Sequence, residues 1–195
     1  MAGVDEAEFE AIRDGELAEI ERQVESEVNF QVREEYTLSP AEVMTLVAER
    51  MAAQPGADTT VALPFTVYGP SLPSPRLTEP IEVPWSQFER SVHDLHSFIQ
   101  RNHQIPNAVW LGSKPVAPEA FLVAMAKIAS KATNGSALPE KVTIAPARLA
   151  TEKYVAIDSP EIWLWPIFPP GFHSEHLMEL ARLQAWTLKP AKRSE

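Results

Sequence analysis

The chain of 195 residues contains no cysteine, which excludes disulfide bonds and thiolate metal sites. It contains no apolar run of the ~20 residues that a membrane-spanning helix needs. Its start is acidic and lacks the positive and apolar regions of a signal peptide, so any signal of a secreted parent protein would lie outside this segment. We therefore expect no membrane insertion. The lack of cysteine fits cytosolic and bacterial surface proteins alike, so the compartment stays open.

The signature sequences of common catalytic sites are also missing. There is no Gly-x-Ser-x-Gly element, no glycine-rich phosphate loop and no cysteine nucleophile. Asp158 and Glu161 lie close together in the sequence, but a glycosidase pair is defined by its separation in space. These absences favour a non-catalytic binding or accessory module without a cofactor, and they leave the question of an enzyme open.

Positive charge is scarce, and negative charge is concentrated at the N-terminus. The net charge is −10, and residues 1–35 contain twelve acidic and three basic side chains. Because the remaining chain is close to neutral and has no basic stripe, we expect no nucleic-acid partner. Residues 1–35 are interpreted as an acidic helix or connector beside a globular domain at residues 36–195. This helix either docks to a partner or presents a solvated face.

The spacing of apolar residues predicts an α+β fold in which short strands alternate with amphipathic helices. The predicted helices cover residues 9–28, 40–51, 85–102 and 118–129, with one more before Trp186, and the predicted strands cover residues 28–32, 61–68, 108–111, 141–144 and 162–168. The first helix is expected to pack on the domain, because its apolar stripe is too irregular for a coiled coil. Five prolines in residues 69–84 predict an extended crossover or a linker.

One phrase of the sequence is repeated. Residues 36–41 read Tyr-Thr-Leu-Ser-Pro-Ala, and residues 186–191 read Trp-Thr-Leu-Lys-Pro-Ala. A looser copy, with Trp110 as its aromatic residue, occupies residues 109–115. Repetition of this kind predicts an internal duplication of a helix–strand–helix–strand unit, with units at about residues 36–108 and 109–195. The aromatic strands of the copies would then share one sheet.

A second pattern follows the helix predicted at residues 85–102. Residues 98–109 read Phe-Ile-Gln-Arg-Asn-His-Gln-Ile-Pro-Asn-Ala-Val, so an aromatic–Ile pair and an Ile-Pro-Asn step precede a short strand. The next helix carries the pair Phe121-Leu122 and then Ala126. This arrangement resembles the pseudomurein-binding repeat, a family found in tandem on surface and wall-associated proteins.

The resemblance covers about residues 85–128. It departs at His103, where the family usually has Gly, and at Gln104, where it usually has a basic residue. The resemblance implies a prokaryotic protein that holds a cell-wall polymer, and therefore an extracellular or cell-surface location.

Aromatic residues are the candidate ligand-binding groups. As a strand, residues 162–168 would project Trp163 and Trp165 from one face, where two indoles can stack on sugar rings. Trp110 and Tyr154 would extend that surface. The alternative is that the tryptophans form the core between the repeated units, since Trp110 and Trp186 hold matching places in the repeated phrase.

The five histidines support a different function. His93 and His96 are three residues apart, as are His173 and His176, and this spacing places both rings of a pair on one helix face. The two pairs hold equivalent places in the proposed repeat, so all four could converge on one metal ion. Neither pair has the His-Glu-x-x-His spacing of metalloproteases.

Two functions therefore remain open. The first is a non-catalytic module of a larger surface or carbohydrate-processing protein, with a polysaccharide, a wall polymer or a neighbouring domain as its partner. The second is a small metal-dependent hydrolase that uses the two histidine pairs. Exposed tryptophans would favour the first function, and convergence of the four imidazoles would favour the second.

Overall fold

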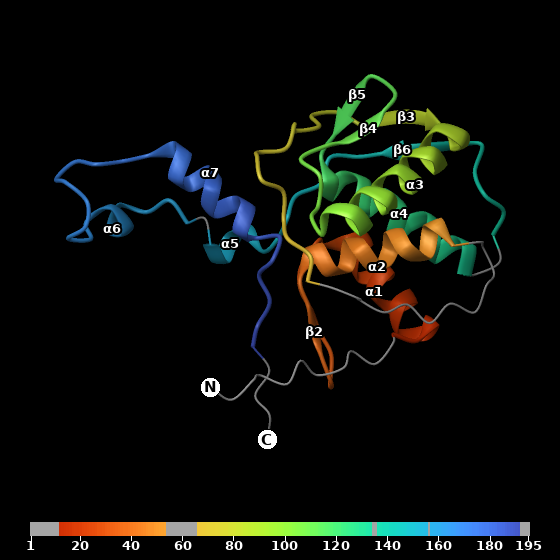
Figure 1. The fold of residues 1–195 in the computed structure, drawn as a ribbon, viewed down its shortest axis with the longest axis horizontal. Coiled ribbons are helices and arrows are strands. Elements are labelled where there is room, and N and C mark those ends of the chain that lie inside the picture. Colours follow the sequence, from red (N-terminus) through yellow and green to blue (C-terminus); the bar gives the residue numbers. More distant parts are fainter. Residues whose placement is uncertain (1–11, 54–65, 134–135, 156, 192–195) are drawn as a thin grey trace.

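The computed structural model describes residues 12–53, 66–133, 136–155 and 157–191 and is shown in Figure 1. The fold is α+β, as predicted: helices dominate, and the strands form only short antiparallel pairs. Within these residues no helix is both long enough and apolar enough to cross a bilayer. The start of the first predicted helix and most of the strand predicted at residues 61–68 lie outside the described residues.

The acidic N-terminal helix is part of the core. Helix α1 (Asp14–Ser26) buries Leu17, Ile20 and Val24 completely and packs against helix α4. The irregular apolar stripe predicted this packing. The buried carboxylate of Glu21 lies 3.6 Å from the Arg50 guanidinium on helix α2. Because a buried charge without its partner is costly, this ion pair ties α1 to α2.

Helix α2 (Pro40–Ala52) begins where the sequence predicts it. The Ser39 hydroxyl accepts a hydrogen bond from the Glu42 amide, and the Glu42 carboxylate accepts one from the Ser39 amide at 2.7 Å. This reciprocal pair is a capping box, and Pro40 occupies the first helical position. Most of α2 is buried between its neighbours.

Helices α3 (Trp85–Asn102) and α4 (Pro118–Thr133) complete the core. The Phe88 ring of α3 lies between Trp85, at a centroid distance of 5.9 Å, and Phe121 of α4, at 4.8 Å. Helix α3 ends at His103, which has a φ of +52° and lies in the left-handed region that favours glycine.

The strands form three separate antiparallel pairs. The pairs are β1 (Gln31–Val32) with β2 (Thr37–Leu38), β3 (Ile81–Pro84) with β6 (Lys141–Ile144), and β4 (Val109–Leu111) with β5 (Lys114–Val116). The prediction of a common aromatic sheet is therefore wrong. Helices α1 to α4 lie between the β1–β2 pair and the β4–β5 pair, so strand β2, next to Tyr36, and strand β4, with Trp110, do not share a sheet (Figure 1).

The proline-rich segment at residues 69–84 is an ordered crossover. The side-chain oxygen of Asn107 accepts hydrogen bonds from the amides of Ser71 and Leu72, at 2.9 and 3.0 Å. Tyr68, just before the crossover, bridges the loop that follows α3. The segment is thus fastened at its start and ends in β3. Of the two predicted structures, a crossover or a linker, the structure shows the crossover.

Residues 157–184 form an arm that projects from the rest of the molecule, the body (Figure 1). The arm follows helix α5 (Glu152–Val155) and contains helices α6 (Pro160–Trp163) and α7 (Glu175–Gln184). The strand predicted at residues 162–168 is wrong, because this stretch finishes α6 and continues in turns. Pro166 in this stretch, with Pro169 and Pro170 just after it, lacks the amide donor that a strand would need.

The two close copies of the repeated phrase lie against each other. The Ala41 amide donates to the Trp186 carbonyl at 2.9 Å, and the Thr37 hydroxyl donates to the Pro190 carbonyl at 3.0 Å. Their conformations differ, however, because Thr37 lies in strand β2 whereas Trp186 lies in a turn after α7. The strand predicted at Trp186 is therefore wrong.

The duplication itself remains a prediction. Strands β3 and β6 of the two halves pair with each other, but the first half runs β2, α2, β3, α3, whereas the second runs β4, β5, α4, β6 and then α5 to α7. Their last helices pack differently, because α3 buries a full apolar face in the core whereas α7 buries only Met178.

Candidate functional site

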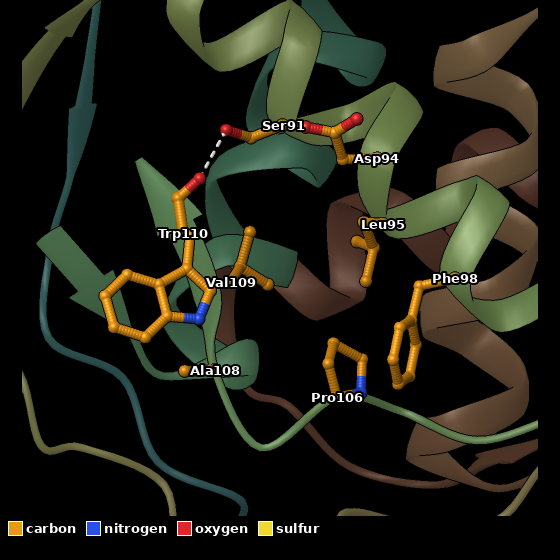
Figure 2. A pocket seen from close by; sticks show the side chains of 8 residues that line it. All are labelled: Ser91, Asp94, Leu95, Phe98, Pro106, Ala108, Val109 and Trp110. Carbon is orange, nitrogen blue, oxygen red and sulfur yellow. Dashed lines mark hydrogen bonds between the residues drawn. The ribbon is translucent and has the colours of Figure 1, made fainter. Parts of the chain in front are cut away.

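An apolar groove lies between helix α3 and strand β4 and has a volume of about 200 Å³. Figure 2 shows the eight residues that line it, which are Ser91, Asp94, Leu95, Phe98, Pro106, Ala108, Val109 and Trp110. We call it the Trp110 groove. Helix α3 supplies one wall, and the loop after α3 with strand β4 supplies the other.

Helical and strand periods position these side chains. Asp94 and Phe98 are four residues apart on α3, so they lie one turn apart on the same face. Strand β4 alternates, which places Val109 and Leu111 in the core and leaves the Trp110 side chain 59% exposed.

One hydrogen bond fixes the two walls of the groove to each other. The Ser91 hydroxyl on α3 donates to the Trp110 carbonyl on β4 at 2.8 Å, the contact drawn as a dashed line in Figure 2. The hairpin from β4 to β5 turns at Gly112, whose φ of +64° is strained for other residues. The Trp110 indole is therefore held on a rigid hairpin beside a rigid helix.

The groove combines an apolar floor with a polar edge. Leu95 and Val109 are buried and form the floor, while Phe98 and Pro106 lie side by side at one end (Figure 2). The exposed Asp94 carboxyl group makes no hydrogen bond or ion pair with any residue that the structure describes. Such a groove offers a ligand an aromatic ring, an apolar surface and free acceptor oxygens.

The predicted aromatic surface is not formed. Trp163 is half-buried, donates from Nε1 to Asp158 at 2.8 Å and packs on Phe168. Trp165 is exposed in the arm, and Tyr154, in helix α5, contacts Phe30. Figure 1 places helix α6 far from strand β4, so the tryptophans of the arm and Trp110 cannot contact the same sugar ring.

The four histidines do not converge either. His96 lies 2.6 Å from Glu49 on helix α2, whereas His173 lies 3.1 Å from Asp158 in the arm. His176 is near Glu179, and His93 is exposed on α3. Among the described residues no group of three or more His, Asp or Glu side chains is arranged to hold a metal ion. The shared metal site predicted from the two pairs is therefore not present.

The most perturbed carboxyl group lies elsewhere, in the first turn of α4. The pKa of Glu119 is raised to about 7, chiefly by burial and to a smaller extent by the nearby Glu152 carboxylate, while a backbone hydrogen bond and the charge of Arg76 oppose the shift. A carboxyl group with a pKa near 7 can act as a general acid. Glu119 does not line the Trp110 groove, where Asp94 is the only titratable side chain.

The sequence indicated Trp110 but not its neighbours. Asp94 lies between His93 and His96, and the sequence pattern of that stretch points to its histidines rather than to Asp94. Phe98 and Pro106 belong to the segment that resembles the pseudomurein-binding repeat, but only the fold brings them beside Trp110. A useful signal was available in the alternation of strand β4, which sends Trp110 outward between two buried aliphatic residues.

No protein-family model matches this chain, and neither a curated protein nor a solved structure matches it.

Proposed function

We propose that this chain is a non-catalytic glycan-binding module that attaches a larger protein to a cell-wall polymer through the Trp110 groove. The observation that carries the proposal is one apolar groove lined by an exposed indole on a hairpin and by an exposed, unpartnered carboxyl group on the facing helix. The function is binding rather than hydrolysis, because the groove contains a single titratable side chain and glycosidases need a pair of carboxyl groups.

The chemistry of each part suits a sugar. The face of an indole is electron-rich, so it attracts the weakly positive C–H groups on the flat face of a pyranose. The Asp94 carboxyl group accepts hydrogen bonds from hydroxyl or amide groups at the edge of the same ring. Phe98 and Pro106 provide an apolar surface for a methyl group or an acetyl substituent.

The resemblance to the pseudomurein-binding repeat adds support, because the segment concerned builds the groove. Residues 98–109 form the end of α3, the loop and the start of β4. His103 occupies the position where the family usually has Gly, and its backbone is left-handed, as glycine favours. Asn107, from the Ile-Pro-Asn step, fastens the crossover to this loop. The resemblance therefore favours a wall polymer as the ligand and a location at the cell surface.

The test is a binding assay with insoluble walls. Purified pseudomurein and, separately, peptidoglycan are titrated with the chain, and the bound fraction is measured after sedimentation. We expect Trp110→Ala to weaken binding by about tenfold or more, as for other central aromatic anchors. Asp94→Ala should weaken it by about fivefold, the cost of one hydrogen bond.

The matched control is Trp165→Ala, which removes an equally exposed indole from the arm and should bind like the unchanged chain. All three side chains are exposed, so the variants are expected to fold normally, and circular dichroism checks this. Equal loss of binding in the Trp110 and Trp165 variants would contradict the proposal. Failure of the unchanged chain to bind either wall would also contradict it.

A further inference from the structure

The arm ends in an uncharged, apolar tip. No residue between positions 162 and 172 carries a formal charge. Leu164, Trp165 and Ile167 are 80%, 63% and 74% exposed, so three neighbouring apolar side chains face the solvent at one turn. Exposed apolar patches of this kind mark contact sites on soluble domains.

The tip is held in shape by an aromatic cluster beneath it. Phe168 and Phe172 stack at a centroid distance of 5.0 Å, and both contact the Trp163 ring. The Asp158 carboxylate accepts a hydrogen bond from the Trp163 indole and lies 3.1 Å from His173. The exposed side chains are thus presented on an organised turn, which lowers the entropic cost of binding.

The body carries a second groove whose character is complementary to the tip. It has a volume of about 350 Å³ and lies between the C-terminal half of α4, residues 136–139 and strand β6. Most of its lining is apolar, and Lys127, Lys131 and Lys141 stand around it. Lys127 and Lys131 form no ion pair with any residue that the structure describes. We call it the lysine groove.

The tip and the lysine groove are bordered by charges of opposite sign. Asp158 and Glu161 flank the apolar tip, and both have a pKa below the ordinary value, so they are ionised at neutral pH. Hydrogen bonds cause these shifts, chiefly from the Trp163 indole to Asp158 and from the Ser159 hydroxyl to Glu161. An apolar projection bordered by carboxylates fits an apolar groove bordered by ammonium groups.

The two surfaces lie at opposite ends of the molecule. In Figure 1 the arm projects to the left of the body, whereas the C-terminal end of α4 and the loop before β6 lie at its right edge. The tip of one copy therefore cannot reach its own lysine groove. We propose that the tip of one copy binds in the lysine groove of a second copy, so that copies associate head to tail. Such heterologous contacts extend into rings or open chains.

The test measures association of the whole chain by sedimentation velocity, from about 1 µM to about 500 µM, the range of weak protein contacts. We expect the mean sedimentation coefficient to rise with concentration beyond that of a dimer. Association should weaken as salt is raised, because the lysine–carboxylate contacts are screened. Trp165→Glu, which breaks the tip, and Lys131→Glu, which breaks the groove, should each be monomeric.

The decisive measurement mixes the two variants. The Trp165→Glu chain keeps an intact groove and the Lys131→Glu chain keeps an intact tip, so an equimolar mixture should form a complex of one copy of each and stop there. The control variants Leu177→Glu, in the arm but outside the tip, and Lys114→Glu, on strand β5, should associate like the unchanged chain. All four substituted side chains are exposed. The four variants should therefore have urea-denaturation midpoints similar to that of the unchanged chain.

Three results would overturn the proposal. One is an unchanged chain that stays monomeric throughout the concentration range, and another is a mixture that forms no complex. The third is flotation of a monomeric chain with phosphatidylcholine vesicles that depends on Trp165, which would make the tip a lipid contact instead.

Discussion

The body and the arm both contain clusters of aromatic side chains, yet only the body buries its cluster. Phe88 and Phe121 are fully buried, and helix α2 packs against both of the helices that carry them, α3 and α4. In the arm, Phe168 and Phe172 stack as closely, but a single short helix and a few turns surround them. Aromatic residues therefore form a core only where several elements cover them, because the gain is proportional to the apolar area removed from water.

Charged residues show the same contrast. In the body the Glu21–Arg50 ion pair is buried between two helices. In the arm the Asp158 carboxylate lies 3.1 Å from the His173 ring in a contact that is open to solvent. The body thus uses charge to fix the relative position of helices, whereas the arm uses it to hold one turn.

The largest expected effect is a difference in the free energy of unfolding between two Phe→Ala variants, one in the body and one in the arm. Phe88→Ala should lower the free energy of unfolding by about 3–5 kcal/mol, because it leaves a cavity between α3 and α4. Phe168→Ala, in the arm, should lower it by less than about 1 kcal/mol, since its ring is only partly covered. Urea denaturation followed by far-ultraviolet circular dichroism measures both values. Similar losses would show that the arm and the body unfold as one unit and would break the comparison.

The second effect concerns two carboxyl groups with opposite pKa shifts. Burial raises the pKa of Glu119 to about 7, so the folded body holds this proton more tightly than the unfolded chain does. Its contribution to stability is complete below pH ~4.5 and is lost as the pH rises through about 7, by roughly 3 kcal/mol in total. Glu119→Gln should remove this loss, so at pH 8 the variant should be the more stable protein.

The arm provides the matched measurement. The Trp163 indole and His173 lower the pKa of Asp158, so its contribution is present at neutral pH and is lost as the pH falls. We expect acid to change the Trp163 fluorescence without unfolding the body, and Asp158→Asn to remove that change. For Glu119, the contradicting result would be a Glu119→Gln variant whose stability depends on pH as that of the unchanged chain does. Glu119 would then not cause the loss of stability expected between pH ~4.5 and 7.

The smallest expected effect is the difference in stability between two variants that each remove a helix cap, one at α2 and one at α7. Ser39→Ala removes half of a capping box and should cost about 1 kcal/mol of global stability. Ser174→Ala removes the cap of α7, a longer bond of 3.4 Å to the Leu177 amide, and should shift the global midpoint by less than half as much. Thermal denaturation of both variants measures the difference. Equal shifts would indicate that α7 is as firmly integrated as α2.

The helices of the body could be predicted from the sequence because their signals are local. The Ser-Pro-Ala-Glu start of α2 and the apolar stripe of α3 each act within one or two turns of backbone. Strand β6 was also predicted at the residues it occupies, 141–144. The hairpin partner β5 was not predicted, since Lys114 and Pro115 give little strand signal and only pairing with β4 extends them.

The candidate site could be predicted only in part. Trp110 and Trp186 hold the same place in the repeated phrase, yet Trp110 is 59% exposed and Trp186 is 2% exposed. Trp186 is covered because Gly69, which has no side chain, lets the crossover lie directly on it. A Cβ atom at Gly69 would come within 2.7 Å of the Trp186 Cβ. Nothing within six residues of either tryptophan encodes this contact.

By itself, the sequence determined the α+β class, helices α2 to α4 of the body, the acidic start and the lack of thiol chemistry. These features follow from composition and from interactions between residues that are close along the chain. The tertiary structure alone decided which tryptophan is exposed, which carboxyl group lines the same groove and where the four histidines lie. Those outcomes depend on segments far apart in the sequence, whose meeting is fixed by the packing of α1 to α4 and the course of the crossover.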